Sequence, residues 1–183
     1  MTRFKILIIP FLFLLSCKND LSKFKSTFDN SILNTERAED VTILYSKEGF
    51  VKARLTTKTF HHIQNTLVPY IEMKNGLKME FFDDSLKSSS TLTAKYGKYF
   101  EQNGNVLVRD SVVILNNKKE QLNTEELVWN EKIQKFYTEK FVKITTPTQI
   151  IYGDGLESNQ NFSEYKIINI KGIIGVNKSS IPL

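Results

Sequence analysis

Few side chains in this sequence are of the types that hold metals or catalyse reactions. His61 and His62 are adjacent, and adjacent side chains of a strand point to opposite faces, so the pair makes a poor metal site. Asp83 and Asp84 fall in a turn pattern, where carboxylates are normally solvated. The chain has no other histidine and only one cysteine to complete a ligand set. We therefore expect no metal site and no cofactor.

Catalytic patterns are missing as well. The sequence contains no G-x-S-x-G nucleophile motif, and its acidic residues are scattered among lysines instead of being paired for acid–base work. Gly153-Asp154-Gly155 offers one carboxylate in a glycine-rich turn pattern, for which backbone geometry is a sufficient explanation. We predict that the protein is not an enzyme and has no catalytic residues.

The single cysteine, Cys17, follows a targeting pattern. Arg3 and Lys5 precede an apolar run of ten residues, which is too short to cross a bilayer comfortably. The string Leu14-Leu15-Ser16-Cys17 resembles a lipobox, where bacterial lipoprotein signal peptides are cut before a cysteine that becomes lipidated. We predict a lipoprotein signal peptide over residues 1–16 and lipidation of Cys17, which would anchor the chain to a membrane. A soluble secreted protein and an uncleaved signal anchor are the alternatives.

Composition narrows the class of partner. Without residues 1–16 the 183-residue chain keeps 167 residues, enough for one domain with its own core. The formal charge falls from +5 to +3 with the loss of Arg3 and Lys5, and no basic run is present, so we expect no nucleic-acid partner. No cysteine besides Cys17 is available for a disulfide, so the fold must be stable through packing alone.

Beyond Asp40 the apolar residues recur with a period of two, which is typical of half-buried strands. Val41, Ile43 and Tyr45 share one face of such a strand. Turn signals such as Asn75-Gly76 separate the segments, and no later stretch sustains an amphipathic helix. The pattern predicts an all-β fold.

A short phrase recurs along this all-β region. Its copies are Leu92-Thr93-Ala94-Lys95-Tyr96-Gly97, Leu122-Asn123-Thr124-Glu125-Glu126-Leu127 and Ile151-Tyr152-Gly153-Asp154-Gly155-Leu156, which start 30 and 29 residues apart. A fixed period of this length is typical of stacked units that complete one another's core. Stacked hairpins leave an open edge at each end, where another strand can add.

Several motifs together resemble the LptC family, the periplasmic components of the lipopolysaccharide-export ABC transporter. They are Ser90-x-Leu92-x-Ala94-x-Tyr96, Leu122-x-Thr124-x-x-Leu127-x-Trp129, Ile151-x-Gly153-x-Gly155-Leu156 and Ile170-Lys171-Gly172. The resemblance covers about Val41 to Val176. One departure is Asp110-Ser111-Val112, which stands where many members have Gly-Asn-Val and leaves the geometry of a β-bulge open.

The resemblance implies an open, V-shaped β-jellyroll of two antiparallel sheets over residues 41–178. A lipidated tether over 17–40 would precede it, and a short tail over 179–183 would follow. It also implies a subunit at the periplasmic face of the inner membrane. That subunit takes lipopolysaccharide from the inner-membrane ABC transporter and passes it to LptA.

Candidate site residues follow from the alternation. The inward-facing apolar residues that we expect to line a lipid groove are Leu92, Ala94, Tyr96, Val112, Ile114, Leu122 and Trp129. By family analogy the edge with Val41, Ile43 and Tyr45 faces the transporter, and the edge with Ile168 and Ile170 faces LptA. The alternatives are a structural or protein-binding envelope lipoprotein with a closed jellyroll, and a carrier with a closed cavity.

Overall fold

The computed structural model describes residues 35–64, 66–130 and 132–175. The predicted signal peptide, Cys17 and the tail over 179–183 lie outside these residues. All regular structure in the described segments is strand, as the period of two predicts, and they contain no helix that could span a membrane.

Every strand pairing in the described segments is antiparallel. The strands are β1 (Thr35–Lys47), β2 (Phe50–Ile63), β3 (Tyr70–Met73), β4 (Leu77–Phe82), β5 (Ser88–Ala94), β6 (Tyr96–Phe100), β7 (Asn105–Asn116), β8 (Gln121–Asn130), β9 (Lys135–Thr145), β10 (Gln149–Asn159), β11 (Tyr165–Ile167) and β12 (Ile170–Gly175). β1 begins at Thr35, so residues 35–40 belong to the sheet and not to the predicted tether. Their backbone pairs with β2 from Thr59 to Ile63, which extends the edge strand.

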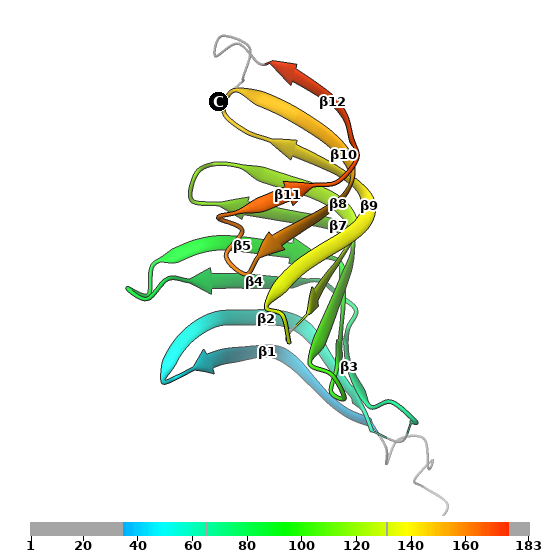
Figure 1. Ribbon diagram of the computed structural model, residues 1–183. Coiled ribbons are helices and arrows are strands. Elements are labelled where there is room, and N and C mark those ends of the chain that lie inside the picture. The colour runs from blue at the N-terminus through cyan, green and yellow to red at the C-terminus, as the bar shows by residue number, and fades with distance from the viewer. Residues whose placement is uncertain (1–34, 65, 131, 176–183) are drawn as a thin grey trace, which may run out of the picture. The chain divides into compact units, whose positions relative to one another are not determined.

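The hydrogen bonds divide the sheet into two layers that share their long strands. In layer A, β4 and β5 lie between the first half of β2 and the second half of β7, and β12 pairs with the first half of β10. In layer B, β3 and β6 lie between the second half of β2 and the first half of β7, and β11 pairs with the second half of β10. β1 runs along the whole of β2, and β1 and β12 lie at opposite ends of the stack (Figure 1). This two-layer arrangement is the expected jellyroll, with both sheets joined in one hydrogen-bonded network.

The strands pass from one layer to the other along a row of bends, which we call the corner line. Gly76 lies between β3 and β4 with φ +87, and Asp110 and Ser111 bulge out of β7 with φ of +66 and +57. Hydrogen bonds join neighbouring bends: the Gly76 N–H donates to the Lys95 carbonyl at 2.9 Å, and the Lys95 N–H donates to the Asp110 carbonyl at 3.0 Å. The departure at Asp110-Ser111 is thus a bulge built from two non-glycine residues in the left-handed region.

The recurring phrase marks this corner in strands that run in the same direction. Its first residue is buried in layer A and its sixth in layer B, as in Leu122 and Leu127. Two successive antiparallel strands with their turns take about 30 residues, which is the period of the phrase. The expected turn at Gly153-Asp154-Gly155 was wrong, because these residues form a bulge inside β10. Gly155 has φ +103, and a Cβ on Gly153 would collide with the side chain of Ile167.

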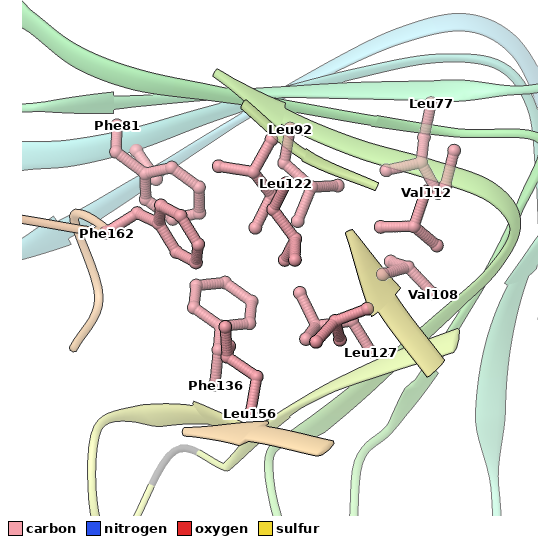
Figure 2. Close-up of a cluster of buried hydrophobic side chains, with 14 of the residues drawn as sticks. Leu77, Phe81, Leu92, Val108, Val112, Leu122, Leu127, Phe136, Leu156 and Phe162 are labelled. Atoms are coloured by element: carbon pink, nitrogen blue, oxygen red, sulfur yellow. The ribbon is translucent and has the colours of Figure 1, made fainter. Parts of the chain in front are cut away.

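The inner faces of the two layers pack into one core in the middle of the stack. Leu92 and Leu122 of layer A and Leu127 and Leu156 of layer B are completely buried and point toward one another (Figure 2). The phenyl rings of Phe81, Phe136 and Phe162 gather at one side of this cluster (Figure 2).

Candidate functional site: an apolar cleft between the layers

Near β1 and β2 the inner faces do not fill the space between the layers, and a cleft of about 330 Å³ remains. Nearly all of its lining side chains are apolar or aromatic, and Gln160 is the exception. Layer A contributes Ile43, Tyr45, Ala53, Leu55, Met79 and Phe81, and layer B contributes Phe60, Ile71, Met73, Tyr99, Val106 and Trp129. The strand period explains this composition, because residues two apart on each strand face the same interior.

A cluster of three aromatic rings closes the inner end of the cleft. The ring of Phe81 in layer A meets Phe136 in layer B edge to face, with centroids 5.7 Å apart. Trp129 packs against the same Phe136 ring at 4.9 Å. At the outer end, Ile43 and Tyr45 on the edge strand remain 38% and 37% exposed. The cleft therefore opens toward β1 and ends where the packed core begins.

The residues predicted for the groove are distributed over three environments. Leu92, Val112, Ile114 and Leu122 are core residues with 0–1% exposure, and Ala94 is buried at the corner line. Tyr96 lies on the opposite face of layer B, where its hydroxyl donates to a Glu72 carboxylate oxygen at 2.8 Å and Arg109 stacks over its ring. Trp129 is the one predicted groove residue that lines the cleft, which the predicted edge residues Ile43 and Tyr45 line as well. Lipid contact by all seven residues stays a prediction.

Sequence reasoning missed the cleft residues of β2, β3, β4, β6 and β7. Their alternation was visible in Leu55 and Met79, but core and cleft residues share the same parity. What separates them is their position near the end of the stack, where fewer strands cover the inner faces. Among the inward-facing apolar residues, those close in sequence to the first strand could have been predicted to line the cleft.

The two ends of the stack carry the predicted edge residues. In the described part of the chain β1 pairs only with β2, and β12 pairs only with β10. Val41 is half-buried on β1, while Ile170 and Ile173 of β12 are 57% and 58% exposed. Ile168 is in the bend before β12, and its N–H already donates to the Gly155 carbonyl at 2.9 Å.

A group of polar side chains lies in layer B where β1 begins and β2 and β6 end. His62 Nδ1 is 3.0 Å from a Glu36 carboxylate oxygen, and its Nε2 is 2.6 Å from Glu101. The hydrogen bonds from His62 and Gln64 hold the pKa of Glu36 below its usual value. These contacts tie β1, β2 and the end of β6 together. Across residues 35–64, 66–130 and 132–175 no group of three or more histidines, cysteines or carboxylates is placed to hold a metal.

Fold and cleft together define a class: a two-layer β-jellyroll whose apolar interior opens between the layers and whose first and last strands are edges. The family model described as "Lipopolysaccharide-assembly, LptC-related" matches residues 33–174, and the chain belongs to this family. The match spans both layers. The family consists of transport components of the Gram-negative envelope and is not an enzyme family, which makes this protein a component of lipopolysaccharide transport. No curated protein matches the chain significantly.

Proposed function

We propose that the protein is a membrane-anchored conduit that holds the acyl chains of lipopolysaccharide in the apolar cleft and passes them on. The observation that carries the proposal is the 330 Å³ cleft with its apolar lining. In a jellyroll with a purely structural role we would expect a fully packed interior without such a cleft. Binding pockets for apolar ligands have this composition, with few polar groups.

The energetics favour a conduit over a tight carrier. Burial of one CH₂ group in an apolar site is favourable by about 0.8 kcal/mol. The free-energy cost of releasing several acyl chains into water is therefore prohibitive. Transfer into an adjoining apolar groove nearly cancels that cost. The edges of the stack supply a way to align grooves, because strand addition continues both layers into a second jellyroll.

In this proposal Cys17 carries the lipid anchor and holds the domain at the periplasmic face of the inner membrane. The β1 edge, with Ile43 and Tyr45, faces the ABC transporter, which supplies the energy. The β12 edge faces LptA. The exposed Ile170 and Ile173 suit an apolar interface at that edge.

Photocrosslinking in cells tests the lipid contact. A benzophenone amino acid replaces Tyr99 or Trp129 in the cleft, and Phe141 provides the matched control. Phe141 is also aromatic, but it is 55% exposed and stacks on Tyr152, a cross-strand neighbour outside the cleft lining. We expect lipopolysaccharide adducts at both cleft positions and none at the control. Functional protein without a cleft adduct would refute the conduit.

A charge placed on the last strand tests the edge assignment. Ile173→Lys adds a charge to β12, which disfavours strand addition. Leu115→Lys is the control, because Leu115 is 45% exposed on the interior strand β7. We expect only the first variant to capture less LptA from solution. Equal capture by both variants would count against the β12 assignment.

A further inference from the structure

The connection between β10 and β11 crosses from layer B toward layer A. Phe162 in this connection is 1% exposed and stacks on Tyr165 with ring centroids 5.2 Å apart. Its φ of +55 is unusual for a bulky residue, so the surrounding contacts must hold this conformation in place. We call residues 160–164 the strap.

Three contacts latch the strap and the adjoining Tyr165 to the end of β7 and the turn that follows it. Asn116 Nδ2 donates to the Phe162 carbonyl at 3.1 Å, and Lys118 Nζ donates to the Ser163 carbonyl at 3.2 Å. The Tyr165 hydroxyl next to the strap is hydrogen-bonded to Glu120. Asn116 is itself fixed, because its Oδ1 accepts the N–H groups of Lys118 and Glu120 at 2.9 and 3.0 Å. These contacts therefore tie layer A to layer B on the side of the stack opposite the corner line.

On the side toward β1 the turns of the two layers leave a polar hollow of about 490 Å³. Lys47, Lys52 and Asp83 line it from layer A, and Gln134 and Asn161 line it from layer B. Phe81 and Gln160 line both this hollow and the apolar cleft. An amphiphile with chains in the cleft would thus have its polar head in the hollow, directly beside the strap.

Beyond the cleft the inner faces of the two layers are packed together, so a lipid that moves toward β12 has to separate the layers. The chains lie between the layers while the polar head must stay in water, because burying unpaired polar groups is costly. The head has to travel along the gap between the layers, and the latched strap spans that gap.

We propose that the strap is a gate, which must release the β7–β8 turn before a lipid can pass from the cleft to the β12 edge. This rests on the proposed conduit function. The gate gives Phe162 and the three latch contacts a role beyond core packing.

The experiment locks the strap in the full-length protein in cells. Lys118→Cys and Ser163→Cys are joined by a short bis-maleimide, and each single variant treated with the same reagent serves as control. A photocrosslinker at Tyr99 reports loading of the cleft, and one at Ile173 reports arrival at the edge. We expect the lock to leave the Tyr99 adduct unchanged and to lower the Ile173 adduct about tenfold.

The outcomes separate the two proposals. An equal Ile173 adduct in locked and unlocked protein overturns the gate and leaves the conduit standing. Absence of the Tyr99 adduct in unlocked protein overturns the conduit and the gate with it.

A conservative variant probes the opposite direction. Tyr165→Phe keeps the ring that stacks on Phe162 and removes the hydroxyl bound to Glu120. With the latch weakened by one hydrogen bond we expect the Ile173 adduct to rise about threefold. A lower or unchanged adduct would contradict the gate.

Discussion

Phe81 of β4 and Phe136 of β9 meet edge to face across the interior, with an interplanar angle of 85°. This contact joins layer A to layer B at the point where the open cleft gives way to the packed core. On one side of it Ile43 and Tyr45 are partly exposed, and on the other Leu92 and Leu122 are completely buried. The pair therefore sets the length of the cleft and anchors the core at the same time.

Replacing either phenylalanine of this pair with alanine should destabilise the protein, and the effects of the two replacements should not be additive. Phe81→Ala and Phe136→Ala each remove a ring that is 2–3% exposed, so each should lower the free energy of unfolding by about 3–5 kcal/mol. The double variant should lose about 1 kcal/mol less than the sum, because either single change already removes the ring contact. Urea unfolding of the four proteins measures the coupling. Strict additivity would mean that the two rings do not stabilise each other.

Two glycines of the C-terminal strands should respond differently to the same change. In Gly153→Ala the new methyl group meets the Ile167 side chain and lies 2.9 Å from the Ile168 carbonyl oxygen. Overpacking of this kind should cost about 1–3 kcal/mol of stability. Gly172→Ala is the matched control, because nothing lies within 4 Å of its added Cβ. Similar unfolding midpoints for both variants would contradict the close packing of β11 on β10.

Much of the fold could be predicted from the sequence because strand alternation reports directly on which side chains face inward. Leu77, Phe81 and Leu92 alternate with polar residues and are buried as expected. The period of about 30 residues also predicted the stacking, since each copy of the phrase marks a strand that crosses the corner line. Local spacing carries this information because both strands and hairpins are local structures.

The position of the site was harder to predict. Leu92 in the core and Met79 in the cleft have the same parity, and only the number of covering strands separates them. That number depends on the order of strands across the sheet, which local spacing does not encode. The bulge at Gly153-Asp154-Gly155 resembled a turn for a similar reason, because glycine serves both structures.

The bulge in β7 contains removable strain. Ser111 has φ +57, where an L-residue is disfavoured by about 1–2 kcal/mol, and its hydrogen bond to Glu125 comes from the backbone N–H, which glycine would keep. Ser111→Gly relieves that strain but adds freedom to the unfolded chain, so we expect a net gain of about 0.5 kcal/mol. Ser111→Val should destabilise, because a β-branched residue fits this region worst. The urea midpoint should be highest for Ser111→Gly, intermediate for the wild type and lowest for Ser111→Val. The reverse order would contradict the backbone conformation of the bulge.

Two tyrosines should make the protein sensitive to alkali. Burial, followed by the nearby carboxylate of Glu72, raises the pKa of Tyr96 to about 12, and burial with the carboxylate of Glu120 raises that of Tyr165 to about 12. Both folded-state values lie above the unfolded value of about 10. The stabilisation is therefore fully present below pH 10 and is lost as the pH rises from about 10 to 12, because the unfolded chain releases these protons first. Thermal unfolding of the wild type should shift to lower temperature in this window, and the shift should shrink in the double variant Tyr96→Phe, Tyr165→Phe. Parallel curves for the two proteins between pH 9 and 12 would show that other groups cause the loss.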